Sequence, residues 1–142
     1  MSQGETIHAG CVVLGEAGVL IRGEAGAGKS TLARELLLGA GSAGLFCRLV
    51  SDDRTRIRIK HGRVIASPVD PIAGFIEIRG IGIVERPFER AAVIRLVVDL
   101  CESPPRHPEP QDAVVEICGV MLPRIRAGTG TLLADVVFAT RS

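Results

Sequence analysis

Most apolar residues in this chain fall into short runs of strand length, separated by turns that contain glycine or proline. These runs predict strands over residues 11–14, 19–22, 45–50, 54–60, 63–66, 91–100, 114–117 and 132–138. Two tight turns are expected between neighbouring strands, at residues 15–18 and at His61-Gly62. Residues 54–60 alternate basic with apolar side chains, so one face of that strand should meet solvent.

Helical spacing of apolar residues occurs in two segments. Leucines at 32, 36 and 37 predict a helix over residues 30–38, and the glycines at 39, 41 and 44 should end it. Ile72, Phe75 and Ile76 would share one face of a short helix over residues 72–78, which glycines at 80 and 82 then break. Because strands outnumber helices, the sequence predicts an α/β fold with a mixed sheet and few helices, formed by a single domain over residues 1–142.

The composition narrows the functional classes. With Lys+Arg 17 and Asp+Glu 16, the net charge is +1, which argues against a general nucleic-acid binder. Trp and Tyr are absent, so an aromatic base-stacking platform is not expected. No apolar run reaches the roughly 18 residues of a membrane span, and the start, MSQGETIHAG, lacks the pattern of a secretory signal. We therefore expect a cytoplasmic protein without nucleic-acid or membrane partners.

The four cysteines, at positions 11, 47, 101 and 118, include no CxxC pair. Neither a zinc ribbon nor a thioredoxin-like redox motif is therefore expected. Cys11, Cys47 and Cys118 lie in or beside apolar segments, and we expect them to be buried small hydrophobic residues in a reducing compartment.

The segment between the predicted strand 19–22 and the predicted helix 30–38 matches the phosphate-loop pattern G-x-x-x-x-G-K-[ST]. Its glycines let successive backbone amides point inward around an anion, and the start of the helix adds partial positive charge. Lys29 would act on the β- and γ-phosphates, and the Ser30 hydroxyl would bind Mg²⁺. A glycine-rich turn with an ordinary surface lysine is the alternative. We predict binding of a nucleotide or another polyphosphate by these residues: Gly23, Glu24, Ala25, Gly26, Ala27, Gly28, Lys29, Ser30 and Thr31.

Three acids and one histidine are further candidates. Asp52 and Asp53 follow an apolar run, where one carboxylate could orient a metal and the other take a proton from an attacking hydroxyl; a simple turn or helix cap is the alternative. Glu77 lies between two isoleucines, so it is either paired or metal-bound, or else exposed on a short helix beside Arg79. His8 precedes the first predicted strand, and a lone histidine is more often structural or solvated than catalytic.

Together these motifs resemble the catalytic domain of bacterial HPr kinase/phosphorylase, from about Thr6 to Phe138 and in the same order. The similar segments are GVLIRGEAGAGKS, LVSDDRTRI and FIEIRGIGIVE, and the last of them resembles the family signature. The resemblance implies a P-loop-containing mixed sheet and an ATP- and Mg²⁺-dependent kinase. Such a kinase phosphorylates a serine of HPr, the phosphocarrier of the sugar phosphotransferase system, and can reverse the reaction with inorganic phosphate.

The resemblance also implies roles for individual residues. Asp52 or Asp53 would accept the proton of the target serine and donate it in the reverse step, and Asp52 is the preferred one. His8 matches a family histidine near the active site. The implied catalytic residues are His8, Lys29, Asp52 and Asp53, and the implied metal ligands are Ser30 and Glu77.

The sequence departs from the family at both ends. Family members carry a separate N-terminal domain, whereas this sequence starts almost at His8, so it resembles a short form. Near the other end, Leu122-Pro123-Arg124-Ile125 fits a family motif with an active-site arginine, but that arginine is not assigned to a position here. Assembly into a homo-oligomer, which the family shows, stays an open expectation.

The sequence leaves more than one interpretation for each of two segments and for the function of the chain. Basic residues at 54, 56, 58, 60 and 63 concentrate charge on one hairpin, which is either a docking face for an acidic partner or a solvated strand edge. The proline-rich residues 103–111 should form an exposed loop, either a lid or a tolerated insertion. Besides an HPr kinase, the sequence is compatible with a non-catalytic ATP-sensing regulatory module and with a kinase of a small hydroxyl compound.

Overall fold

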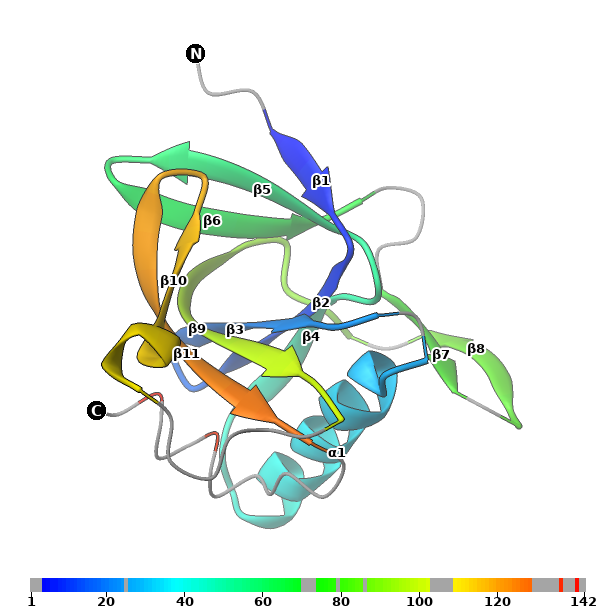
Figure 1. The fold of residues 1–142 in the computed structure, drawn as a ribbon. Coiled ribbons are helices and arrows are strands. Elements are labelled where there is room, and N and C mark those ends of the chain that lie inside the picture. The colour runs from blue at the N-terminus through cyan, green and yellow to red at the C-terminus, as the bar shows by residue number, and fades with distance from the viewer. Residues whose placement is uncertain are drawn as a thin grey trace.

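Strands dominate the described chain, and a single α-helix follows the phosphate-loop segment (Figure 1). This computed structural model describes residues 4–24, 26–69, 74–78, 80–85, 87–102 and 109–128, together with residues 136 and 140. In chain order the elements are β1 (Glu5–Ile7), β2 (Ala9–Leu14), β3 (Ala17–Arg22), α1 (Lys29–Ser42), β4 (Cys47–Ser51), β5 (Thr55–Lys60), β6 (Arg63–Pro68), β7 (Phe75–Ile78), β8 (Gly82–Glu85), β9 (Ala92–Leu100), the 3₁₀-helix η1 (Pro110–Ala113), β10 (Val114–Ile117) and β11 (Val120–Ala127).

The main sheet is mixed. Its strand order is β1-β5-β6-β9-β3-β2-β4, with β11 paired to β9 and β10 paired to β11. Strand β9 is parallel to β3 on one side; on the other it pairs antiparallel with β6 near its start and parallel with β11 near its end. The predicted α/β fold with a mixed sheet and few helices is therefore confirmed.

Both faces of the central strands are buried (Figure 1). Helix α1 covers one face, where Leu32 packs in one cluster with Val19 and Ile21 of β3. The β5–β6 hairpin lies over the other face, where Ile57 packs in a second cluster with Leu20. Because successive side chains of a strand point to opposite faces, a strand covered on both sides is apolar at every position, as the VLI run of β3 is.

Four strands bring their carboxyl ends to one edge of the sheet. β3, β9 and β11 run parallel, and β2 is antiparallel to both β3 and β4, so β4 points the same way as β3. The described residues that follow these strands therefore meet at this edge: Gly23, Glu24, residues 26–28, Asp52-Asp53, Cys101 and Gly128. His8 lies there too, because it precedes the oppositely directed β2. In open α/β sheets ligands bind outside the carboxyl ends of the strands, so this edge is the expected site.

Helix α1 is longer than the sequence predicts. It continues past Gly39 and Gly41 to Ser42, although glycine is a poor helix former. Ala40 is completely buried in the core cluster beneath the helix, and this packing compensates for the weak local preference of the two glycines. The helix ends before Gly44, whose φ of 72° is a conformation that glycine adopts readily.

The predicted short helix over residues 72–78 is wrong. Within this range residues 72 and 73 lie outside the described chain, and the remainder is a turn at Gly74 and strand β7, which pairs antiparallel with β8. The side chains of β7 alternate, since Ile76 is completely buried whereas Phe75 and Glu77 are exposed. A short apolar run fits a helix and a strand equally well, and here the pairing with β8 decides.

The structure also tests the predictions for the strand at 132–138, the proline-rich segment, the cysteines and the other strands. The predicted strand 132–138 lies outside the described residues except for Val136, which is helical and buried, so the prediction is wrong at that residue. Residues 103–108 of the proline-rich segment lie outside the described chain, and its end enters η1. Cys118 is exposed, contrary to expectation, whereas Cys11 is buried and Cys47 is half-buried. The other predicted strands are present with ends shifted by a few residues.

Candidate active site

The phosphate-loop segment joins β3 to the start of α1, where the first backbone amides of the helix have no partner within the helix. Gly26 and Gly28 have φ values of 84° and 103°, and a Cβ at either would meet nothing within 4 Å. Gly28 is the N-cap of α1 and its helix start carries no side-chain cap within the described residues. Uncapped amides at a helix N-terminus bind anions, and the helix dipole adds to the attraction. The residues present therefore fit a phosphate chain.

Lys29 lies inside this loop rather than on the surface. Only 6% of its side chain is exposed, and its Nζ donates hydrogen bonds to the carbonyl oxygens of Gly23 (2.8 Å) and Glu24 (3.1 Å). A buried ammonium group is costly without partners. The two carbonyls and the Asp53 carboxylate, 3.7 Å from Nζ, supply them. This placement argues against an ordinary surface lysine.

Asp52 connects three elements at the same edge. Its Oδ1 accepts a hydrogen bond from the Ser30 hydroxyl of α1 (2.6 Å), and its Oδ2 accepts one from the backbone amide of Glu77 in β7 (2.9 Å). Hydroxyl and carboxylate oxygens are the ligands that Mg²⁺ prefers, usually with one or two carboxylates and with substrate phosphates completing the shell. The group around Asp52 therefore fits a magnesium ion beside a phosphate chain.

Asp53 occupies the outer side of the same turn. Its φ of 64° turns the chain back toward β5, and its side chain is 54% exposed. The carboxylate lies 3.7 Å from Lys29 Nζ and 3.9 Å from Nδ1 of His8, which is itself 81% exposed. The two neighbouring aspartates thus face different partners: Asp52 faces the helix start, and Asp53 faces Lys29 and His8.

A buried pair of hydroxyls fixes this acidic turn to the sheet. Ser51 Oγ and Thr55 Oγ1 are 2.5 Å apart, and Thr55 donates a hydrogen bond to the carbonyl oxygen of Ala9 (2.7 Å). Both hydroxyls are buried, so the bonds are made without competition from water. Thr55 and Ser51 flank the aspartates in sequence but were not among the predicted site residues.

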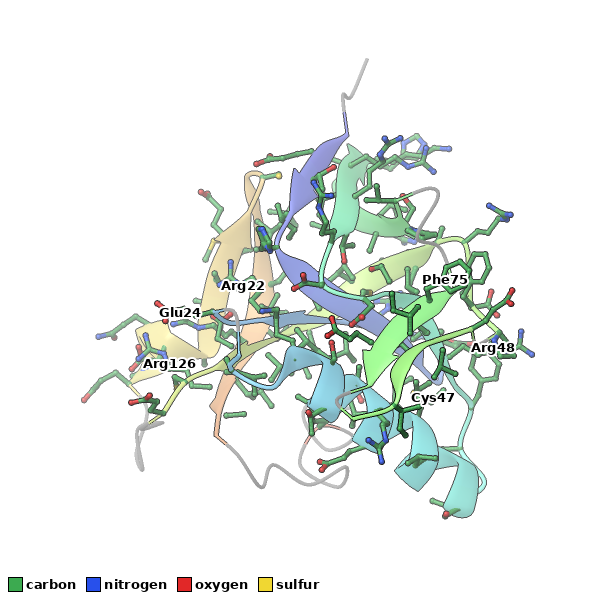
Figure 2. All side chains as sticks on the ribbon, turned by 90° about the vertical axis from the view of Figure 1, so that its right-hand side faces the viewer. Arg22, Glu24, Cys47, Arg48, Phe75 and Arg126 are labelled. Atoms are coloured by element: carbon green, nitrogen blue, oxygen red, sulfur yellow. The ribbon has the colours of Figure 1, made fainter. Side chains whose placement is uncertain are left out.

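A charged network holds the opposite side of the loop. Arg22, the residue before Gly23, donates two hydrogen bonds to Asp99 at the end of β9 (2.7 and 2.8 Å). Arg124 of β11 donates to the same carboxylate (3.3 Å) and lies 3.7 Å from Asp112. Figure 2 shows Arg22, Glu24 and Arg126 on one side of the molecule, with Arg48 and Phe75 on the other.

The arginines determine the ionisation of Asp99. Burial alone raises the pKa of this carboxyl, but the hydrogen bonds and charges of Arg22 and then Arg124 outweigh burial, and the pKa lies below its ordinary value. The network therefore ties the first residues of the loop to β9 and β11 through an ionised carboxylate.

We expect Asp99→Asn to lower the free energy of unfolding at neutral pH by about 1.5–2 kcal/mol, the lower part of the range for hydrogen bonds to a charged group. Because the folded-state pKa lies below the unfolded value of about 3.9, the ionised carboxylate stabilises the fold above that pH, and the contribution is lost as the pH falls through the folded-state pKa. The difference between variant and wild type should shrink below about pH 4. Urea unfolding across this range measures it.

Glu89→Gln is the matched control. Glu89 lies 3.6 Å from Arg48, and the two side chains are 39% and 48% exposed. An exposed pair contributes about 0–1 kcal/mol, so this variant should unfold nearly as the wild type does. Equal losses for the two variants, or a loss for Asp99→Asn that does not change with pH, would contradict the role given to the Asp99 network.

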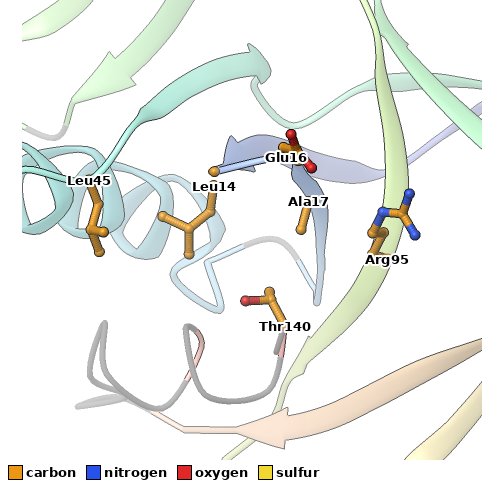
Figure 3. A pocket seen from close by; sticks show the side chains of 7 residues that line it. Leu14, Glu16, Ala17, Leu45, Arg95 and Thr140 are labelled. Atoms are coloured by element: carbon orange, nitrogen blue, oxygen red, sulfur yellow. The ribbon is translucent and has the colours of Figure 1, made fainter. Parts of the chain in front are cut away.

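Two cavities lie away from this edge. One of about 270 Å³ surrounds the β2–β3 turn and the start of β3, with Leu14, Glu16, Ala17, Leu45, Arg95 and Thr140 around it (Figure 3). Another of about 370 Å³ lies between β6, β9 and β11. Because the phosphate loop follows the other end of β3, the cavity of Figure 3 is at the far end of that strand from the loop.

Comparison with known proteins identifies the domain. The family described as HPr Serine kinase C-terminal domain matches residues 1–126. The chain belongs to this family. The resemblance found in the sequence is thereby confirmed.

Individual relatives agree with this membership. The HPr kinase/phosphorylase of Enterococcus faecalis is 35% identical over 146 residues, which cover 93% of this chain and 45% of that protein. The HPr kinase/phosphorylase of Streptococcus thermophilus is 30% identical over 138 residues, covering 89% of this chain and 43% of that protein. The solved structure of the Hpr(Ser) kinase/phosphatase from Coxiella burnetii matches with a TM-score of 0.78 and 27% identity, covering 96% of this chain and 88% of that one. The chain spans less than half the length of the two curated relatives.

Within this HPr kinase domain, the structure brings most of the predicted site residues together. Those linked by the contacts above are His8, Gly23, Glu24, Lys29, Ser30, Asp52, Asp53 and the backbone of Glu77. The Glu77 side chain is exposed on a strand, not on a helix, and it joins the site through its amide. Thr31 is exposed on α1, while Ala25 and Arg79 lie outside the described residues.

The described residues were also compared with the requirements of a metal-ion site and of a membrane-spanning helix. No group of three or more His, Cys, Asp and Glu side chains within those ranges is placed to hold a metal ion by itself. None of the helices found there combines the length and the apolar character needed to cross a membrane.

Proposed function

We propose that this chain is the catalytic domain of an ATP-dependent protein-serine kinase whose acceptor is the phosphocarrier HPr. The observation that carries the proposal is the hydrogen bond from Ser30 to Asp52, with the Glu77 amide on the other carboxylate oxygen and Lys29 inside the adjoining loop. Membership of the family supports the class of enzyme proposed, since the relatives above are called HPr kinase/phosphorylase.

The loop residues bind the triphosphate in this proposal. The amides of Gly26, Gly28, Lys29 and Ser30 donate hydrogen bonds to the phosphate oxygens, and Lys29 exchanges its two carbonyl partners for the β- and γ-phosphates. Ser30 and the Glu77 side chain, the two ligands that the resemblance implies, would hold Mg²⁺ beside Asp52; for this the Glu77 carboxylate, which is exposed here, would have to turn toward Ser30. When bound, the metal neutralises charge on the phosphoryl group that is transferred.

The acceptor serine needs a group that takes its proton. Of the two aspartates that the family resemblance implies for this role, Asp52 is our assignment, because its carboxylate accepts the Ser30 hydroxyl at the end of the loop where the γ-phosphate is expected. Asp53 lies beside Lys29 and His8 instead. In the reverse reaction with inorganic phosphate, the protonated carboxyl returns the proton to the serine oxygen.

The remaining assignments follow the same proposal. The protein acts in the cytoplasm, without nucleic-acid or membrane partners, and assembly into a homo-oligomer stays an open expectation. Basic residues on the β5–β6 hairpin, among them Arg56, Arg58 and Lys60, are exposed beside the edge strand β1. They are either a docking face for the acceptor protein or a solvated strand edge.

Incubation of the purified chain with HPr, ATP and Mg²⁺ tests the proposal, with intact-protein and peptide mass spectrometry as the readout. We expect one phosphoserine on HPr, formed about 10²-fold or more slowly by a Lys29→Met variant. Tight ATP binding without transfer to HPr would instead indicate the ATP-sensing module, and transfer to free serine or a sugar alone would indicate a small-molecule kinase. Failure to bind ATP and Mg²⁺ would remove all three.

A further inference from the structure

The cavity of about 370 Å³ between β6, β9 and β11 contains two arginines and no acid among the described residues that line it. Arg63 of β6 and Arg95 of β9 are these arginines, and both are exposed. Every other described residue of the lining is uncharged. The cavity is therefore a hollow with a net positive charge on its wall.

A β-bulge sets the position of Arg95 on the central strand. The register between β3 and β9 shifts there, because Gly18 pairs with Ile94 whereas the next residue of β3 pairs with Leu96. Arg95 is thus the extra residue of β9 and has no partner on β3. The two strands approach closely at this point, since a Cβ at Gly18 would lie 2.6 Å from a backbone carbonyl oxygen of β9. A bulge redirects the side chain at the extra residue, and bulges often occur beside functional sites.

The antiparallel pairing of β6 with β9 brings Arg63 to the same place. Ile65 pairs with Val93. Arg63 precedes Ile65 by two residues, and Arg95 follows Val93 by two residues. Residues two apart on a strand point to the same face, which agrees with the presence of both arginines in the wall of one cavity.

Neither arginine is neutralised by an acid. Within the described residues, the side chains of Arg63 and Arg95 form no ion pair and no hydrogen bond, and Arg63 lies directly opposite another cation, Lys60. Two acids occupy neighbouring positions: Glu16 beside the cavity of Figure 3, and Glu116 opposite Met121 on β10. Neither acid lines the cavity of 370 Å³. Like charges on facing positions destabilise a sheet, so a bound anion would offset a cost that the fold carries here.

We propose that this cavity binds a small organic anion whose phosphate or carboxylate group is held by Arg63 and Arg95. A guanidinium group donates paired hydrogen bonds in a geometry that matches both kinds of oxyanion, and such charge-assisted bonds are stronger than neutral ones. Val93 and Leu122 add apolar surface to the wall, so the remainder of the ligand is uncharged and partly apolar. A volume of about 370 Å³ lies within the range of small-molecule sites.

This cavity is separate from the phosphate loop. Leu100 is the last residue of β9, and Arg95 precedes it by five positions, which corresponds to about 16 Å along a strand. The loop follows the far end of the parallel strand β3. The anion at Arg63 and Arg95 is therefore a different ligand from the proposed nucleotide, and the inference does not depend on the proposed kinase function.

Met121 provides a reporter in the wall of the cavity. It is 59% exposed, and the chain contains two methionines in total. Protein labelled with ¹³C at the methionine methyl groups gives one NMR signal from each, and a Met121→Leu variant assigns them. We titrate phenyl phosphate and benzoate, with benzyl alcohol as the neutral control. The Met121 signal should shift saturably with at least one of the two anions and should stay unchanged with benzyl alcohol.

Substitution of the arginines tests their role. Arg63→Gln and Arg95→Gln should each weaken binding of the anion by about tenfold or more, because each removes charge-assisted hydrogen bonds. Arg58→Gln is the matched control, since Arg58 is exposed on the same β5–β6 hairpin but does not line the cavity. Arg58→Gln and Lys29→Met should both bind the anion as the wild type does. Thermal unfolding shows that each variant is folded.

The contrary results are distinct. No shift of the Met121 signal with either anion up to about 10 mM would overturn the inference, and so would an equal shift with benzyl alcohol. Wild-type affinity in folded Arg63→Gln and Arg95→Gln would remove the arginines from the site. An equal loss in Arg58→Gln would reduce the effect to overall charge, and a loss in Lys29→Met would place the anion at the phosphate loop; either result would overturn the inference.

Discussion

Replacement of Lys29 by methionine is expected to lower kcat/KM for phosphoryl transfer by about 10²-fold or more, the loss typical when one preorganised charge or donor is removed from a transition state. Methionine fills much of the space of the aliphatic stem, which is 6% exposed, but has no charge for the phosphates. ATP affinity should fall as well, because the lysine binds the ground state too. Steady-state kinetics and calorimetry measure the two effects.

Lys60→Met is the matched control for this variant. Lys60 is exposed at the end of β5, away from the loop, so its replacement removes the same charge without touching the site. It should leave ATP affinity unchanged. The Lys29 carbonyl partners, Gly23 and Glu24, lose a donor in Lys29→Met, so thermal unfolding must show that the variant is folded. A folded Lys29→Met with wild-type transfer would exclude this loop from the chemistry.

Asp52→Asn is expected to lower kcat by about 10²–10⁴-fold, the usual contribution of a general base. Asparagine can still accept the Ser30 hydroxyl with its carbonyl oxygen, but its amide group then faces the amide of Glu77, donor against donor. ATP binding should persist, because the loop amides and Lys29 are unchanged. Single-turnover transfer, measured beside ATP affinity, separates the two effects.

Asp53→Asn is the natural comparison, since the two residues are adjacent and face different partners. We expect a smaller loss of kcat, because Asp53 contacts Lys29 and His8 rather than the start of α1. Activity retained in Asp52→Asn and lost in Asp53→Asn would move the proton acceptor to Asp53. Wild-type rates in both variants would eliminate a carboxylate base from this site.

Some residues of the site could be predicted from the sequence because the pattern that indicates them lies within a few neighbouring positions. The phosphate-loop motif is contiguous, the strand before it and the helix after it are each visible in a few residues, and the structure contains both elements as β3 and α1. The aspartate pair is similar, since an acid directly after a buried strand lies at a strand end whatever the partner strands are. These features depend on neighbours along the chain.

Other residues of the site have no local signal. Arg22 and Asp99 are 77 positions apart, and each alone is only a charged residue at the end of an apolar run. Glu77 was expected to act through its side chain, but the contact with Asp52 is made by its backbone amide, which no residue type encodes. The error over residues 72–78 has the same origin, because β8 decides the conformation of β7.

The amino-acid sequence by itself determined the phosphate loop, the strand and helix that flank it, and the acids that follow a buried strand, because short-range backbone preference and apolar spacing are enough to specify them. Only the tertiary structure decided that β4, β3, β9 and β11 point to one edge. It also decided that Asp99 of β9 binds Arg22, the residue before the loop, and that a cavity opens at the ends of β9 and β11. These depend on which strands pair, and strand pairing between distant segments is set by the burial of both sheet faces at once rather than by any one segment.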